Sequence, residues 1–86
     1  MNIEKATKLA KAKKTVEFGE DSVGRMQYVN IRFWEGGKNQ RAYIAVYRPE
    51  HLTKNDAQGW IDLRTGEVNI TGGQRTMEIA LEKLGL

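Results

Sequence analysis

The chain has 86 residues, no cysteine, and 14 Lys and Arg against 11 Asp and Glu, which gives a formal net charge of +3. This length predicts one domain spanning residues 1–86, and the lack of thiols excludes disulfides, a cysteine nucleophile and thiolate metal sites. The longest apolar run, residues 43–47, is far shorter than the roughly 20 residues that cross a bilayer. We therefore expect a cytoplasmic protein with no membrane-spanning segment or secretion signal.

The positive charge is concentrated in residues 1–14, which hold five Lys against one Glu, whereas residues 15–86 hold nine Lys and Arg against ten Asp and Glu. The segment predicts a basic amphipathic helix with its apolar residues opposite a lysine stripe. Such a stripe is most often a solvated face, and it is also suited to following phosphates. The stripe consists of Lys5, Lys8, Lys11 and Lys14.

Two stretches rich in β-branched and aromatic residues predict the first hairpin. Residues 26–34 and 41–48 are these stretches, and the polar, glycine-bearing segment 35–40 between them predicts the connecting loop. Residues 15–18 alternate briefly and predict a short strand, whose place in the sheet is left open. Pro49 cannot donate to a strand ladder, so residues 50–58 are expected to be a polar connection.

The last third of the chain predicts a second hairpin and a second helix. Residues 60–63 and 68–70 flank a turn at 64–67, whose glycine suits a left-handed position. Residues 74–84 then place apolar side chains on one helical stripe, and Gly85 marks the end of the helix. The overall prediction is an α+β fold in α-β-β-β-β-β-α order, with both helices on one face of an antiparallel sheet of four or five strands.

Strand pairing assigns the side chains to two faces. Setting Trp34 opposite Arg41 places Ile31 opposite Ile44 on an aliphatic inner face. In the second hairpin, we expect Leu63 opposite Val68 and Ile61 opposite Ile70 on the same side. The opposite, outer face then carries aromatic and arginine side chains, namely Tyr28, Arg32, Trp34, Arg41, Tyr43, Tyr47 and Trp60.

This aromatic and arginine face, extended by the lysine stripe, is the candidate binding site. Flat rings stack on unpaired bases and guanidinium groups bind phosphates, a combination that single-stranded nucleic acid or RNA uses. The same residue types dominate protein interfaces, and cation–π pairing within the sheet accounts for part of the pattern without any ligand. The sequence alone leaves these alternatives open.

Catalysis and metal binding have weaker support. His51 is the only histidine and no acid is placed by spacing to orient it. Asp62 and Glu67 approach each other across the second hairpin, but beside Arg64 they are more simply surface ion-pair partners. No Cys/His cluster or spaced set of acidic residues predicts a metal site. We therefore expect no enzymatic activity and no cofactor.

The sequence thus favours a small non-catalytic domain that binds single-stranded nucleic acid or RNA. The alternative is a protein-binding inhibitor or adaptor, or a homodimer, that uses the same face. A compact chain without cysteine also fits the size class of phage- or plasmid-borne anti-defence proteins, which is an analogy and not a resemblance.

Overall fold

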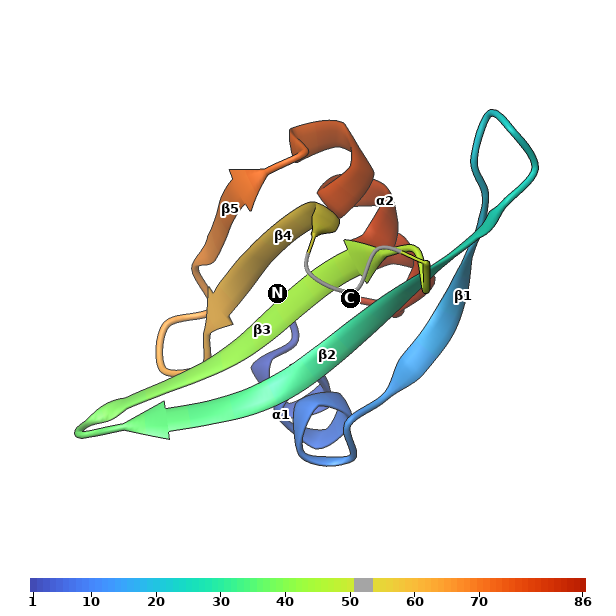
Figure 1. Cartoon of the computed structure of the whole chain (residues 1–86). Helices are drawn as coiled ribbons and strands as arrows, with labels where there is room; N and C mark the ends of the chain where they lie inside the picture. The colour runs from blue at the N-terminus through green and yellow to red at the C-terminus, as the bar shows by residue number, and fades with distance from the viewer. Residues whose placement is uncertain (51–53) are drawn as a thin grey trace.

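The structure, a computed structural model, describes residues 1–50 and 54–86 and confirms the α+β fold in α-β5-α order (Figure 1). Five antiparallel strands pair in the order β1-β2-β3-β4-β5, so each strand lies beside its neighbour in the sequence. The elements are α1 (Ile3–Lys11), β1 (Thr15–Glu20), β2 (Met26–Gly36), β3 (Asn39–Tyr47), β4 (Asn55–Asp62), β5 (Val68–Gly72) and α2 (Gln74–Lys83).

The predicted register of the first hairpin is confirmed along its whole length. Trp34 pairs with Arg41 and Ile31 with Ile44. Pairing continues past the predicted strand ends to Gly36 and Asn39, so the expected six-residue loop is only a two-residue turn. The first strand joins the sheet, with Thr15 opposite Asn30.

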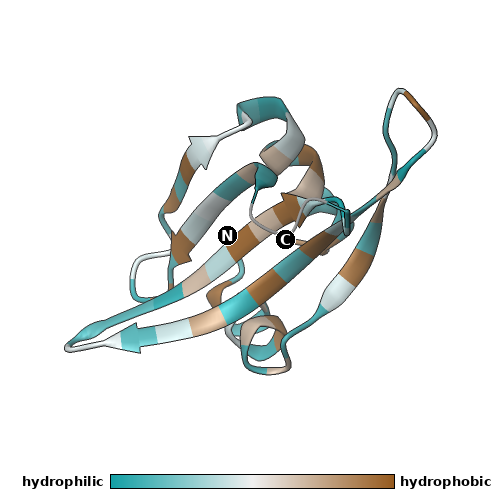
Figure 2. Ribbon diagram, in the orientation of Figure 1, coloured by the Kyte–Doolittle hydropathy of each residue, from teal (hydrophilic) through white to brown (hydrophobic). Residues whose placement is uncertain are grey.

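One hydrophobic core lies between the sheet and both helices. Apolar and polar residues alternate along β2 and β3, as Figure 2 shows, and the aliphatic members face the helices. Helix α1 packs on β2 and β3, while α2 packs mainly on β3, β4 and β5. The core includes Val29, Ile31, Ile44, Val46 and Ile61 of the sheet, Ala6 and Ala10 of α1, and Met77, Ala80 and Leu84 of α2.

The predicted register of the second hairpin is wrong by two residues. Val68 pairs with Ile61 and not with Leu63, and Ile70 pairs with Gly59. The cause is the position of the four-residue loop, which covers residues 63–66 and not 64–67 and is closed by a hydrogen bond from the Asp62 N–H to the Glu67 carbonyl. Because side chains alternate with a period of two, this shift leaves every side chain on its predicted face. Leu63 instead extends the β3–β4 pairing by donating to the Gln40 carbonyl and remains buried.

Two further predicted boundaries are also wrong. Residues 55–58 belong to β4 and not to a polar connection, because their pairing with β3 and β5 continues through two irregularities in register. Helix α1 ends at Lys11, so Lys14 lies outside it. Lys13 adopts a left-handed φ of 53°, and the Lys13 and Lys14 N–H groups donate to the Ala10 and Leu9 carbonyls. This arrangement is a Schellman motif, which turns the chain out of the helix and into β1.

Gly59 lies at a close approach of β4 to β5 and α2. A Cβ atom at this position would lie 2.6 Å from the Asn69 carbonyl oxygen and 3.3 Å from the Met77 methyl group. We expect Gly59→Ala to lower the free energy of unfolding by about 1–3 kcal/mol, because the core has no space for the added methyl group. Urea denaturation of the wild type and the variant measures this loss.

Gly72 supplies the matched control, because a Cβ there would meet nothing within 4 Å. We expect Gly72→Ala to change the free energy of unfolding by less than about 0.5 kcal/mol. Equal losses in the two variants would contradict the tight packing at Gly59.

A polar cluster lies at one end of the inner layer. The Arg48 guanidinium pairs with Asp21 at 3.4 Å and with Asp56 at 3.2 Å, and Gln27 donates to Asp56. The N–H groups of Arg25 and Val23 donate to Asp21. The hydrogen bond from Arg25, together with that from Val23 and the charge of Arg48, outweighs the opposing effect of burial and lowers the pKa of Asp21.

This lowered pKa predicts an acid-sensitive contribution to stability. A carboxyl group with a lower pKa in the folded than in the unfolded state stabilises the protein above the unfolded pKa of about 3.9, and this stabilisation is lost as pH falls through the folded value. We expect Asp21→Asn to be less stable than the wild type at neutral pH and to lose less stability between about pH 5 and pH 2. Urea midpoints across this range measure both effects, and identical pH profiles would contradict the assignment to Asp21.

Candidate binding face

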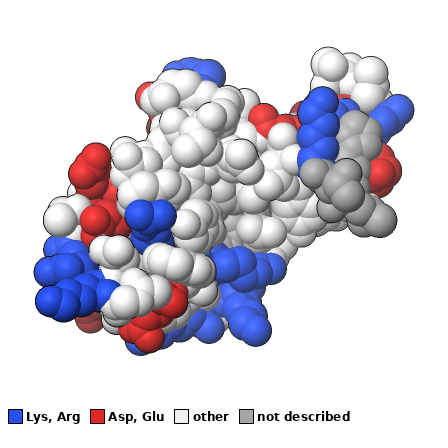
Figure 3. All heavy atoms as spheres, turned by 60° about the vertical axis from the view of Figure 1, so that its left-hand side comes forward, with Lys and Arg blue, Asp and Glu red and all other residues white. Residues whose placement is uncertain are grey.

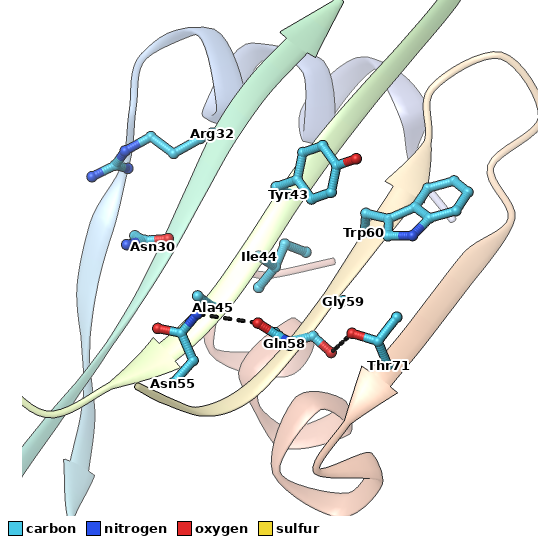
Figure 4. Close-up of a pocket in the computed structure, with 10 residues that line it drawn as sticks. All are labelled: Asn30, Arg32, Tyr43, Ile44, Ala45, Asn55, Gln58, Gly59, Trp60 and Thr71. Carbon is cyan, nitrogen blue, oxygen red and sulfur yellow. Dashed lines mark hydrogen bonds between the residues drawn. The ribbon is translucent and has the colours of Figure 1, made fainter. Parts of the chain in front are cut away.

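Seven of the predicted site residues lie together on the outer face of the sheet, the side opposite both helices. Their positions follow from the register, because each alternates with a core residue on its own strand. Figure 4 shows Arg32, Tyr43 and Trp60 on this side, with the helices behind the strands. We call the set the outer face; it consists of Tyr28, Arg32, Trp34, Arg41, Tyr43, Tyr47 and Trp60.

The rings form two separate groups and not one continuous patch. Tyr28 and Tyr47 pair near one end, with ring centroids 6.0 Å apart. Trp34 and Tyr43 meet edge to face at 6.1 Å near the other end, where Trp60 pairs with Tyr43. Trp34 and Tyr43 are 41% and 37% exposed, whereas the other three rings are half-buried. The two more exposed rings are thus the surfaces most open to a ligand.

Arg41 is held among the second group of rings. Its guanidinium carbon lies 3.8 Å from the Trp60 ring centroid and 5.4 Å from that of Trp34. Its Nη1 donates to the Tyr43 hydroxyl at 3.0 Å. Cation–π attraction and this hydrogen bond therefore fix the arginine within the sheet surface.

The Arg32 side chain points away from Arg41, toward the start of β1. Its Nη1 donates to the carbonyls of Lys14 and Ile31, and its Nη2 donates to the Thr15 hydroxyl. Figure 4 shows its side chain extending away from Tyr43. The two arginines of the outer face therefore lie apart: Arg41 is held between rings of β2 and β4, and Arg32 reaches toward β1.

A depression of about 310 Å³ lies between the two groups of rings. Ala45 lies across from Asn30 on one side and Gln58 on the other, and its short side chain leaves the surface hollow. Tyr43 and Trp60 line the depression, together with the amides of Asn30, Asn55 and Gln58 and the hydroxyl of Thr71. The Asn55 amide donates to the Gln58 side chain at 3.2 Å, and the Thr71 hydroxyl donates to the Gln58 carbonyl at 3.3 Å.

Our sequence-based site missed these amide-bearing residues. The predicted register already placed Asn30 on the outer face opposite Ala45. The small side chain of Ala45, in a row between larger ones, is the signal for a hollow. Gln58 could not be found in this way, because the sequence placed it in a connection and not in β4.

The lysine stripe lies on the opposite side of the sheet from the outer face, because α1 packs on the inner side. The Lys11 ammonium lies 5.0 Å from the ring centroid of Phe33, which packs against the inner core. Lys5 and Lys8 lie on the same helix, and Lys14 lies beyond its end. In the view of Figure 3, uncharged atoms occupy much of the middle of the surface, and Lys and Arg atoms lie toward its lower part and margins.

Within residues 1–50 and 54–86, no group of three or more His, Cys, Asp or Glu lies close enough to hold a metal ion. His51 falls outside the described residues. The Asp62 carboxylate accepts a hydrogen bond from the Arg64 N–H within the hairpin loop. No helix in the described part of the chain is long and apolar enough to cross a membrane.

Comparisons with protein-family models, with curated proteins and with solved structures found no match to this chain. The chemistry of the outer face is therefore the basis on which a function can be proposed.

The distances around Arg41 predict a difference between its two cation–π contacts. In double-mutant cycles that combine Arg41→Gln with Trp60→Leu or with Trp34→Leu, we expect a coupling free energy of about 0.5–1 kcal/mol for Trp60 and a smaller one for Trp34. Free energies of unfolding from urea denaturation provide the measurement. Equal coupling to both rings would contradict the closer stacking on Trp60.

Proposed function

We propose that this protein is a small non-catalytic module that binds single-stranded nucleic acid, RNA or DNA, on its outer face. The observation that carries the proposal is the depression beside Tyr43, in which an exposed ring adjoins the amides of Asn30 and Gln58. An exposed ring offers a stacking surface for a base, and an amide offers both a donor and an acceptor to a base edge.

Single strands fit this surface better than a duplex. Stacking on a protein ring requires a base that has left its own helix. Reading a DNA major groove commonly uses a helix, and both helices of this protein pack on the inner face. The outer face instead presents a sheet on which bases spread flat.

The electrostatic contribution of the outer face is expected to be modest. Arg41 and Arg32 are both engaged in hydrogen bonds within the protein. If they contact one or two phosphates, the slope of log affinity against log salt concentration is about −0.7 to −1.4. Stacking then contributes most of the affinity, at about 1–3 kcal/mol per base.

A protein-binding function, as an inhibitor, an adaptor or a homodimer, is the second candidate. It is favoured by the group in which Arg41 lies between Trp34 and Trp60, because Trp, Tyr and Arg are the residues that most often dominate binding energy at protein interfaces. For either candidate we propose the cytoplasm as the location, because a chain without cysteine needs no oxidising compartment to fold.

Binding of a fluorescently labelled single strand tests the first candidate. We expect Tyr43→Ala to weaken binding by roughly 5- to 150-fold, which corresponds to the loss of one stacked base. Tyr43→Phe keeps the ring and removes only the hydroxyl group, so it should bind within a few-fold of the wild type. Fluorescence anisotropy at low salt measures the affinities, with an unlabelled duplex of the same sequence as competitor.

The outcomes separate the two candidates. Absence of single-strand binding at low salt, or equal binding by Tyr43→Ala and the wild type, would refute the nucleic-acid proposal. A stable dimer in light scattering that Trp34→Ser disrupts would instead assign the outer face to self-association.

A further inference from the structure

One end of β2 has no neighbouring strand on the side away from β3. β1 pairs with β2 only as far as Asn30, and the Ile31 N–H donates to the carbonyl of Lys14, the residue before β1. β2 continues to Gly36 and pairs there only with β3. Figure 1 shows β2 running on past the start of β1 toward the β2–β3 turn. Residues 32–36 therefore form a free edge in the described part of the chain, which we call the β2 edge.

Positive charges lie on both sides of the β2 edge. On the outer side, the Arg32 guanidinium is fixed by the Lys14 carbonyl and the Thr15 hydroxyl. On the inner side, the Lys11 ammonium lies over the ring of Phe33, the next residue along β2. Consecutive side chains of a strand point to opposite faces, so these two cations lie on opposite sides of the same short segment.

Helix α1 carries further positive charge away from the β2 edge. Lys8 lies one turn before Lys11 on α1, and both side chains are exposed. The ion pairs found within residues 1–50 and 54–86 involve Arg25 and Arg48 and none of the lysines of residues 1–14. An anionic ligand would therefore meet lysines that form no ion pair with a carboxylate of the described residues.

We propose that a nucleic-acid strand bound on the outer face continues over the β2 edge and onto α1. Arg32 and Lys14 hold its phosphates at the crossing, and Lys11 and Lys8 hold them beyond it. This inference rests on the proposed function and gives the separated lysines and rings a common ligand. A flexible single strand can turn around the edge of a sheet, whereas duplex DNA, with a persistence length of about 150 base pairs, resists so sharp a bend.

The route sets the length of the ligand. The distance from Trp60 on β4 to Arg32 on β2 covers two strand spacings, about 10 Å. The route to Lys8 adds a layer spacing of about 10 Å and a helical turn of about 5 Å. At about 3.4 Å per nucleotide in a stacked strand, the outer face takes about 3 nucleotides and the whole route about 7. A strand of about 4 nucleotides held on the outer face therefore stops short of Lys8, and one of about 12 reaches it; OB-fold sheets bind single strands over a similar range, about 4–16 nucleotides.

The test compares labelled single strands of about 4 and 12 nucleotides on the wild type, on Lys8→Gln/Lys11→Gln, and on the control Arg75→Gln/Lys83→Gln. The control removes the same charge from α2. For the longer strand we expect the lysine variant to bind roughly 10- to 30-fold more weakly at about 0.1 M salt, with a salt slope smaller by about 1.4, as the loss of two phosphate contacts predicts. The shorter strand should bind all three proteins within about threefold.

Each other outcome contradicts the route. If the lysine variant weakens both strands alike, the lysines attract either strand without the outer face, and the route is wrong. If it weakens the longer strand no more than the control does, the strand does not reach α1. If the longer strand needs the lysines but Tyr43→Ala leaves its affinity unchanged, its path does not begin on the outer face. If neither strand binds the wild type, the proposed function itself fails. Circular dichroism on all three proteins establishes that the exposed substitutions leave the fold intact.

Discussion

Cross-strand pairing between β2 and β3 decides which side chains of this protein meet solvent. With Ile31 opposite Ile44, one aliphatic row faces inward on each strand, and the residues between them face outward. The remaining strands inherit this division because they add to the same sheet. Both helices then cover the aliphatic side of the sheet, because their own apolar stripes are buried there against its rows of aliphatic side chains. The outer face is what this burial leaves uncovered.

The sequence was sufficient for the fold class and for the assignment of residues to faces. Both depend on alternation, and alternation survives an error of two residues, as the second hairpin shows with Ile61 opposite Val68. The sequence was insufficient where hydrogen bonds outside the hydrophobic pattern decide the structure. The end of α1 at Lys11 depends on the left-handed conformation of Lys13, a position that commonly carries glycine. The start of β4 depends on pairing with β3 through an irregular register.

The aromatic and arginine residues of the outer face could be predicted from the sequence, but the arrangement of the whole site could not. Alternation correctly placed seven side chains on the outer face, and the predicted pair of Asn30 with Ala45 already indicated a break between the rings, but it could not place Gln58 beside them. It also could not show on which side of the sheet the lysines of α1 lie, because that depends on how the helix docks and not on its own periodicity. The β2 edge, which lies between Arg32 and Lys11, arises because β1 begins only at Thr15 and leaves the far end of β2 unaccompanied.

The strand order has a consequence for how the protein reaches this structure. Each strand pairs with the one before it, and only two residues separate the paired ends of β2 and β3, so the chain can form its longest hairpin by closing a very short loop. Short loops cost little closure entropy, and sheets built from local pairings fold faster than those that join distant segments. We therefore expect this hairpin to act as a folding nucleus, onto which β1 and β4 add from either side and on which the terminal helices dock.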